Sequence, residues 1–224
     1  MKLALFDLDN TLLAGDSDYA WGQFLVARGV VDGAAYEAAN ERFYAQYKAG
    51  ELDIHEFARF AFRPLRDNPL PRLEAWRREF LDRCIRPMML AEGQRRIDWH
   101  RAQGHEVVII TATNAFVTRP IAEAFGVRHL IATEPARDER GFTGEIAGTP
   151  CFQEGKVARL EEWLRERGVA RPAESWFYSD SHNDLPLLER VHHPVAVDPD
   201  DTLARVARER GWPIRSFRSP AAVS

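Results

Sequence analysis

The strongest indication of the fold is the sequence LALFDLDNT at residues 3–11. The apolar run at residues 3–6 is short, which suits a buried parallel strand better than a helix. Asp7 and Asp9 follow directly, at the carboxyl end of the predicted strand. Open α/β sheets bind their ligands at that edge. Because two carboxylates this close repel each other unless a cation lies near them, the stretch is typical of a strand that leads into a Mg²⁺ site. The alternative is an Asx-rich turn that caps the next element.

Strands and helices alternate along most of the remaining chain. Short apolar runs predict further strands at residues 107–110, 130–132, 176–178 and 194–197. Helical patterns lie between them at residues 92–103, 116–125, 157–167 and 200–210. Residues 141–146 predict a small hairpin on the edge of the sheet. This alternation predicts an α/β fold, with a parallel sheet covered by helices on both faces.

One long stretch, residues 16–87, breaks the alternation. It contains helical patterns and no convincing strand, with helices expected at residues 19–28, 34–49, 54–62 and 73–85. We therefore expect an all-helical unit inserted after the first strand. The predicted division is a catalytic core at residues 1–15 and 88–224 and a helical insert at residues 16–87.

Composition narrows the classes of protein that remain. The chain has 224 residues, a formal net charge of -4, 45% hydrophobic residues and 29% charged residues, as is usual for a soluble globular protein. The sequence has no basic stripe, so we expect no nucleic-acid partner. No apolar run approaches the roughly 20 residues that cross a bilayer, and the start turns acidic at Asp7, too early for a secretory signal. We expect no membrane partner, a cytoplasmic location, and free thiols at Cys84 and Cys151, which lack metal-binding spacing.

Polar residues that could bind phosphate or take part in catalysis follow other predicted strands. Thr111 ends the second strand, where its hydroxyl and the backbone N–H of Ala112 could hold a phosphate oxygen. The alternative for Thr111 is a helix N-cap. Lys156, at the start of a helix, could neutralise a phosphate, and the alternative is a surface lysine. The sequence SDSHND at residues 179–184 places two more carboxylates after a strand, and core packing offers no explanation for such a polar cluster. The alternative is a loop followed by a helix cap.

Taken together, these motifs resemble the haloacid dehalogenase superfamily. Its first motif, Asp-Xaa-Asp-Xaa-Thr, matches residues 7–11, and its second, a Ser or Thr after a hydrophobic strand, matches Thr111. Its third, a lysine, matches Lys156, and its fourth, an acidic pair, matches Asp180 and Asp184. The resemblance implies a Rossmann-like core. The helical insert and the stretch at residues 180–187 are similar to the phosphoserine-phosphatase-like branch, which carries a helical cap of the subfamily IB type.

The resemblance implies a Mg²⁺-dependent phosphatase. Asp7 would attack the phosphorus and form an aspartyl-phosphate. Asp9 would act as general acid for the leaving group and then as general base for water. Mg²⁺ would be held by the Asp7 carboxylate, the backbone carbonyl of Asp9 and the Asp180 carboxylate.

The other motifs would bind the phosphoryl group. The resemblance implies this role for Thr111, the Ala112 N–H and Lys156. Asp184 would orient Lys156 or a metal-bound water, and Asn183 would contact the phosphate or that water.

Substrate choice would lie in the cap. In phosphoserine phosphatases an acidic residue shortly after the first motif holds the substrate ammonium, and Asp16 and Asp18 lie at about that distance. The alternative for both is a helix N-cap. Phosphoserine phosphatases also bind the substrate carboxylate with an arginine of the cap, and alignment places Ala61 at that position. Arg59 and Arg63 are near, but on a helix we expect them to point away from it. We therefore expect a small phosphorylated metabolite with an amine and no carboxylate, such as histidinol phosphate.

Other functions remain open at this point. The chain could be a phosphoserine phosphatase, or a phosphomutase or phosphotransferase on the same scaffold. A non-catalytic binding protein and a protein phosphatase are further alternatives. The sequence leaves the oligomeric state undetermined.

Overall fold

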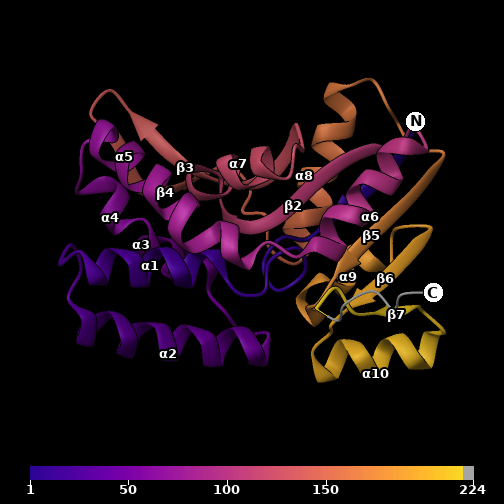
Figure 1. Cartoon of the computed structure of the whole chain (residues 1–224), viewed down its shortest axis with the longest axis horizontal. Helices are drawn as coiled ribbons and strands as arrows, with labels where there is room; N and C mark the ends of the chain where they lie inside the picture. Colours follow the sequence, from indigo (N-terminus) through magenta and orange to yellow (C-terminus); the bar gives the residue numbers. More distant parts are fainter. Residues whose placement is uncertain (219–224) are drawn as a thin grey trace.

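The computed structural model describes residues 1–218, and within them seven strands form one sheet in the order β4-β3-β2-β1-β5-β6-β7 (Figure 1). The strands are β1 (Lys2–Phe6), β2 (Glu106–Asn114), β3 (His129–Asp138), β4 (Gly141–Ala147), β5 (Glu174–Ser179), β6 (His193–Val197) and β7 (Ile214–Arg215). All neighbours pair in parallel except β3 and β4. The α/β fold predicted from the sequence is confirmed.

Two details of the sheet differ from the sequence prediction. Residues 141–146 do not form a hairpin by themselves, because Gly141–Ala147 is one arm and pairs with β3 as the other. The edge strand β7 was not predicted, since two exposed residues are too short to show a hydrophobic period.

Helices cover both faces of the sheet because side chains alternate along each strand. Phe6 of β1 packs in a core with α6 (Ala91–Ala102) and α7 (Ala115–Ala124). Leu5 packs on the opposite face with α8 (Glu154–Glu166). The same face is covered by α9 (Leu185–Leu188) and α10 (Asp201–Arg210).

All regular elements of the insert, within residues 16–87 of the described chain, are helical. Its elements are α1 (Ser17–Ala27), α2 (Gly33–Ala49), α3 (Ile54–Ala61), α4 (Arg63–Arg66), α5 (Leu70–Phe80), the π-turn Leu81–Ile85 and the 3₁₀ turn Arg86–Met88. The helix predicted at residues 54–62 ends one residue earlier, and a second short helix follows at once with Pro64 in its first turn, where proline is tolerated. Helices α1 and α2 lie side by side (Figure 1).

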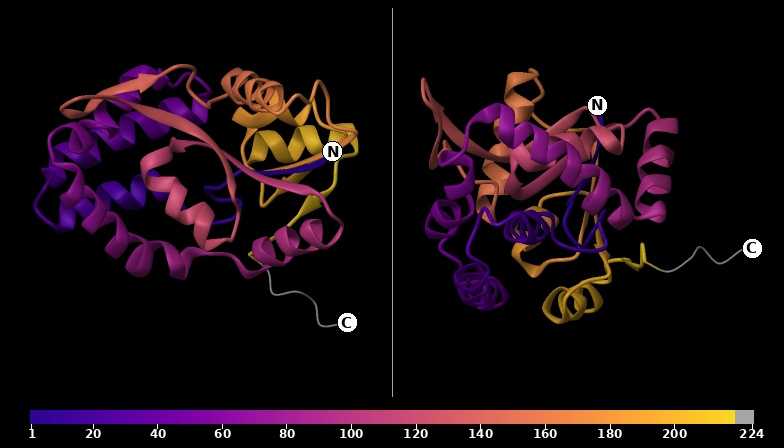
Figure 2. Two further views of the ribbon diagram at one scale, coloured as in Figure 1. Left: turned by 90° about the horizontal axis from the view of Figure 1, so that it is seen from above. Right: turned by 60° about the vertical axis from the view of Figure 1, so that its left-hand side comes forward.

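The chain passes between the sheet and the insert at two adjacent points. Leu13 and Met89 form an isolated antiparallel bridge, and the N–H of Ala14 donates to the carbonyl of Met88 at 2.8 Å. Figure 2 shows the insert on one side of the molecule and α10 with the late strands on the other. The division at residues 15/16 and 87/88 stays a prediction, and this pair of neighbouring crossings supports it.

Two smaller observations bear on the sequence predictions. Cys84 and Cys151 are both free thiols, as predicted. Among residues 1–218, none of the helices combines the length and apolar character that crossing a membrane requires.

Candidate active site

Asp7 and Lys156 form the centre of the site. The backbone N–H of Asp7 donates to the carbonyl of Tyr178 at 2.9 Å, so β1–β5 pairing fixes the backbone from which the carboxylate projects. Lys156 Nζ donates to Asp7 Oδ1 at 2.7 Å, and both side chains are buried. Burial raises the pKa of Asp7 to about 7, although the neighbouring Lys156 lowers it. The site thus places a poorly solvated carboxyl group beside the positively charged side chain of Lys156.

Lys156 also binds Asp184, and this second contact keeps it charged. Lys156 Nζ lies 2.7 Å from Asp184 Oδ1, and Ser179 Oγ donates to Asp184 Oδ2 at 2.7 Å. Burial alone would lower the pKa of Lys156, but the carboxylates of Asp184 and Asp7 raise it. The alternative of a surface lysine is therefore wrong.

Gly155 explains why α8 can bring Lys156 into the interior. A Cβ at this position would lie 1.9 Å from the carbonyl oxygen of Pro150, closer than any side chain permits. The glycine lets the backbone of the preceding loop pass directly over the start of α8.

Asp180 is held next to Asp7 by the threonine of the first motif. Thr11 Oγ1 donates to Asp180 Oδ1 at 3.0 Å, and the N–H of Asp180 donates to Thr11 Oγ1 at 3.0 Å. Burial and the negative charge of Asp7 raise the pKa of Asp180. Two buried carboxylates that repel each other are what a bound cation would stabilise.

The residues present fit Mg²⁺. Nowhere in residues 1–218 do three His, Cys, Asp or Glu side chains gather as a metal site. Mg²⁺ does not require such a cluster, because it usually takes one or two carboxylates and keeps several waters. Asp7, Asp180 and the backbone carbonyl of Asp9 offer only oxygen atoms, which is the donor type that Mg²⁺ prefers.

Asp9 is held at both carboxylate oxygens. The N–H of Ser17 donates to Oδ1 at 2.6 Å, and Thr113 Oγ1 donates to Oδ2 at 2.8 Å. Burial raises the pKa of Asp9 to about 6, with the charge of Asp16 acting in the same direction. A pKa near neutrality suits a group that both donates and accepts a proton. Sequence reasoning missed Thr113, although a second hydroxyl two residues after Thr111 was a visible signal.

Thr111 lies inside β2 and is buried, and its Oγ1 accepts from the N–H of Thr113 at 3.2 Å. It is not the helix cap, because Asn114 caps α7 by accepting from the N–H of Val117 at 3.0 Å. Ala112 lies half-buried between the two threonines.

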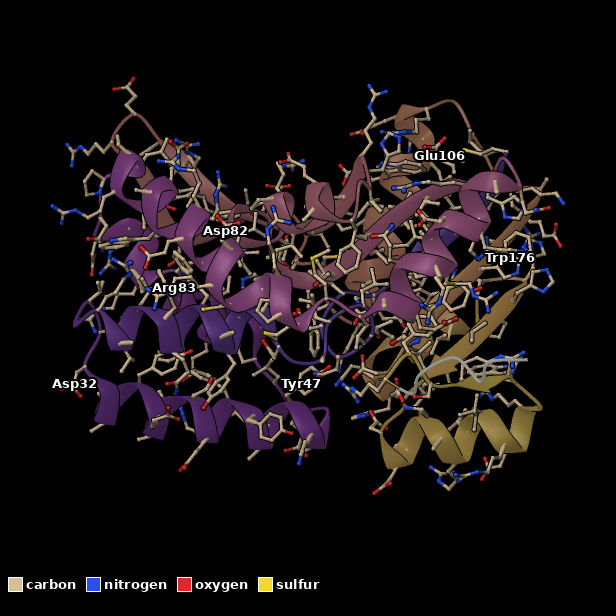
Figure 3. The ribbon with its side chains drawn as sticks, viewed as in Figure 1. Asp32, Tyr47, Asp82, Arg83, Glu106 and Trp176 are labelled. Atoms are coloured by element: carbon tan, nitrogen blue, oxygen red, sulfur yellow. The ribbon has the colours of Figure 1, made fainter. Side chains whose placement is uncertain are left out.

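Asn183 connects the site to the cap. Its Oδ1 accepts from Gln153 Nε2 at 2.9 Å, and its Nδ2 donates to the carbonyl of Tyr47 at 3.2 Å. Gln153 Nε2 also donates to the carbonyl of Gly50 at 3.3 Å, and Tyr47 Oη donates to Ser181 Oγ at 2.8 Å. Figure 3 labels Tyr47 at one end of α2 and Asp32 at the other. The Tyr47 end of α2 is therefore attached to the fourth motif.

Gln153 adopts backbone angles of φ 48° and ψ -122°, which non-glycine residues rarely occupy. Strain of this kind persists where surrounding contacts hold it, and here the Gln153 amide makes both contacts just described.

Asp16 and Asp18 have different surroundings. Asp16 is exposed and caps α1, where its side chain accepts from the N–H groups of Asp18 at 2.8 Å and Tyr19 at 2.9 Å. Asp18 is half-buried and lies 3.4 Å from Asn114 Nδ2, at the end of β2. Burial, followed by the charges of Asp16 and Asp9, raises the pKa of Asp18 to about 8. The N-cap alternative thus holds for Asp16 and fails for Asp18.

The arginines near Ala61 correct one expectation. Arg59 points to β4 and pairs with Glu145 at 3.8 Å. Residues of α1, α2, α3 and α4 line a cavity of about 320 Å³ in the insert, which we name the cap cavity. Both Ala61 and Arg63 belong to its wall, because the helix breaks at Phe62 and the spacing of a continuous helix does not apply. The Arg63 side chain is 74% exposed and pairs with Asp67 at 3.5 Å.

Comparisons with known proteins agree with this geometry. The family model of the haloacid dehalogenase-like hydrolases matches residues 4–189. A histidinol-phosphatase from Neisseria meningitidis serogroup C (strain 8013) is 43% identical over 220 residues, which cover 97% of this chain and 99% of that protein.

Solved structures show the same fold. A protein of unknown function from Bordetella pertussis Tohama I superposes with a TM-score of 0.91 at 45% identity, covering 96% of this chain and 98% of the other. A phospho-aspartyl intermediate analogue of phosphoserine phosphatase superposes with a TM-score of 0.69 at 18% identity, covering 97% and 93%. The chain therefore belongs to the haloacid dehalogenase-like hydrolase family, as its four motifs predicted.

Proposed function

We propose that this chain is a Mg²⁺-dependent phosphatase that hydrolyses a small phosphomonoester, with histidinol phosphate as its substrate. The observation that carries the proposal is the convergence of Asp7, Asp180 and Lys156 at the carboxyl ends of the strands. A nucleophile, a cation site and a fixed positive charge are the three elements that phosphoryl transfer requires. The substrate rests on the relative named histidinol-phosphatase, which matches this chain over nearly its whole length.

Asp7 attacks the phosphorus, and the ester oxygen leaves as Asp7 becomes an aspartyl-phosphate. Asp9 donates its proton to the departing oxygen and then takes a proton from the water that hydrolyses the intermediate. Ser17 and Thr113 hold the Asp9 carboxyl in position for both transfers. Asp7, Asp180 and the Asp9 carbonyl would hold Mg²⁺, and the ion would supply positive charge for the phosphoryl oxygens when bound.

The remaining motifs hold the phosphoryl group. Lys156 supplies positive charge, and Asp184 keeps it oriented through a contact of 2.7 Å. The Thr111 hydroxyl and the Ala112 N–H bind phosphoryl oxygens, and Asn183 holds the cap over the site. The cytoplasmic location stays a prediction.

A substrate panel tests the proposal directly. We expect the protein to release phosphate from histidinol phosphate in the presence of Mg²⁺, with no acceptor other than water. Removal of the ion with EDTA should abolish the release, and added Mg²⁺ should restore it. The measurement is phosphate release over histidinol phosphate, phosphoserine, phosphothreonine, glycerol phosphate and a phosphopeptide. Equal release with and without the ion would contradict the metal role, and release only with an added acceptor would indicate a phosphotransferase.

Replacement of Asp9 separates its chemical role from its structural one. We expect Asp9→Asn to lower kcat by roughly 10²–10⁴-fold, because the amide cannot donate or accept the transferred proton. The loss should be smaller for 4-nitrophenyl phosphate, whose leaving group needs little protonation. Single-turnover kinetics on both esters measures this difference. An identical loss on the two esters would argue against the general-acid role.

Phosphoserine phosphatase is the second candidate. It is favoured by Arg63, which lines the cap cavity and could pair with a substrate carboxylate. Its exposure of 74% and its pairing with Asp67 weaken that case, because an exposed guanidinium gains little from one more ion pair. The relative rates on phosphoserine and histidinol phosphate in the panel decide between the two.

A further inference from the structure

A second cavity lies between α6 and the strands β5, β6 and β7, and none of the catalytic residues lines it. Its volume of about 350 Å³ falls within the range of small-ligand pockets, roughly 300–1,000 Å³. We name it the α6 pocket, and its aromatic and arginine side chains are Arg96, Trp99, Trp176, Tyr178, Trp212 and Arg215. Figure 3 labels Trp176 on β5.

The aromatic wall of the α6 pocket leaves one indole ring open to a ligand. Trp176 is stacked with the rings of His105 and His193, with ring centres 4.6 Å apart in both pairs. Trp99, in contrast, is 45% exposed at the rim. Tryptophan is highly buried on average, and its ring packs well on other flat rings. An exposed indole beside a cavity therefore favours a ligand that carries a planar ring.

Two arginines give the α6 pocket a positive wall. Arg96 of α6 and Arg215 of β7 both line it, and no Asp or Glu of residues 1–218 does. Burial raises the pKa of Tyr178, whereas the charges of Arg96 and Arg215 lower it, so both guanidinium groups act on the same hydroxyl. Two cations that converge in this way repel each other, and an anion between them would remove the repulsion.

Arg96 also has a donor that lacks an acceptor. Its Nε is buried and has no hydrogen-bond partner within residues 1–218. A buried donor without an acceptor is costly, and a ligand oxygen in the pocket would supply one.

A neighbouring carboxylate does not take this role. Glu174 lies outside the wall of the α6 pocket, where it contacts His193 Nε2 at 2.8 Å and Lys2 Nζ at 2.7 Å. Its oxygens are thus already bound to other basic groups.

We propose that the α6 pocket binds a planar aromatic anion, with Arg96 and Arg215 on its phosphate or carboxylate and Trp99 packed on its ring. Guanidinium groups bind both kinds of anion through paired hydrogen bonds. The site is separate from the catalytic residues, and it does not depend on the function proposed above.

Isothermal titration calorimetry on the full chain tests this assignment with two matched pairs of probes. Adenosine monophosphate is compared with adenosine, and indole-3-acetate with indole-3-acetamide, so that each pair shares a ring and differs in the anionic group. EDTA is present throughout to prevent hydrolysis of the ester. Wild type should bind at least one anion, and should bind the matching neutral compound roughly 10-fold more weakly or less tightly still. The pair that shows this difference identifies the anionic group as phosphate or carboxylate.

Three variants separate the contribution of charge from that of the ring. Arg96→Gln should weaken binding of the anion by roughly 10- to 100-fold, and that of its neutral partner by less than about 3-fold. Arg215→Gln should act in the same direction. Trp99→Leu should weaken both members of a pair by a similar factor, because stacking on an indole does not need the charge.

Arg208→Gln is the matched control. Arg208 is exposed on α10, which covers the opposite face of the sheet, and it does not line the α6 pocket. The variant loses the same charge and should bind every probe as wild type does. Phosphate release by the three arginine variants should also stay near wild type, which shows that they are folded.

The proposal is wrong if neither anion binds wild type at millimolar concentration, or if anion and neutral partner bind equally well. A loss in Arg208→Gln as large as that in Arg96→Gln would indicate attraction by net charge alone and would also overturn it. Anion binding that Arg96→Gln leaves unchanged would place the ligand elsewhere, for example at Lys156. Hydrolysis of histidinol phosphate enters none of these outcomes, so the proposed function and this inference can fail independently.

Discussion

The Asp7→Asn variant should have no measurable turnover on any phosphate ester. The amide cannot attack phosphorus, and no other carboxylate is placed to replace it, because Asp184 is bound to Lys156 and Asp180 to Thr11. Loss of a nucleophile of this kind costs on the order of 10⁶-fold in kcat. Phosphate release with purified protein and Mg²⁺ measures the effect, and trapping of the phospho-enzyme with labelled substrate should detect a product only in wild type. Wild-type turnover in the variant would refute the mechanism.

The stability of Asp7→Asn shows whether the protein is still folded. Burial raises the pKa of Asp7 from 3.8 to about 7. For a carboxyl whose pKa is higher in the folded state, ionisation favours unfolding, so metal-free wild type should lose stability as the pH rises from 3.8 to about 7. The variant lacks this ionisation, and its Lys156 is not left unpaired because the ion pair with Asp184 remains. Without Mg²⁺ at pH 8 its melting temperature should equal or exceed that of wild type, while added Mg²⁺ should raise it less than in wild type.

The Lys156→Ala variant should lose both activity and stability. Lys156 is 4% exposed in its side chain and bridges Asp7 and Asp184, whose side chains are 9% and 4% exposed. Removing one partner from a buried ion pair costs roughly 3–5 kcal/mol, because it leaves unpaired charge in the interior. In a chain of this length each kcal/mol changes the melting temperature by about 2–4 °C, so a decrease of about 6–20 °C is expected. The kcat should fall by roughly 10²–10³-fold, the scale for loss of one group that stabilises the transition state.

Lys2→Ala is the matched control for this experiment. Lys2 also makes a 2.7 Å ion pair, with Glu174, but its side chain is 53% exposed. An exposed pair contributes at most about 1 kcal/mol, so the melting temperature and kcat should both stay near wild type. Calorimetry and phosphate release on the two variants measure the contrast. An equal change in the two melting temperatures would show that burial of the Lys156 pair is not what stabilises the protein.

The structure of the cap could be predicted from the sequence only in part. The helical insert could be predicted, because helical periodicity is local and the usual strand–helix alternation is absent there. The break between α3 and α4 at Phe62 was not predicted, and it changes which way Arg63 faces. Successive side chains differ by about 100° in direction only while one helix continues, which follows from 3.6 residues per turn, so this spacing does not apply across a break.

The residues that hydrogen-bond to Asp9 could not be predicted from the sequence for a different reason. Thr113 and Ser17 lie 104 and 8 positions from Asp9 along the chain. Their contacts depend on how β2 and α1 approach the end of β1, which no local pattern records. The same holds for the contacts that Asn183 and Gln153 make with α2.

The α/β fold, the helical insert and the family follow from local patterns, because short apolar strands ending in Asp7, Thr111 and Asp180 occur in a fixed order. The pairing of the polar groups is visible only in the folded chain, where Lys156 is buried between two carboxylates and Thr113 holds Asp9. The same is true of Asp18, which lines the cap cavity, and of Asp16, which caps a helix. Apolar periodicity needs only neighbouring residues, whereas the charge state and partners of a buried polar group are set by atoms brought together from distant parts of the chain.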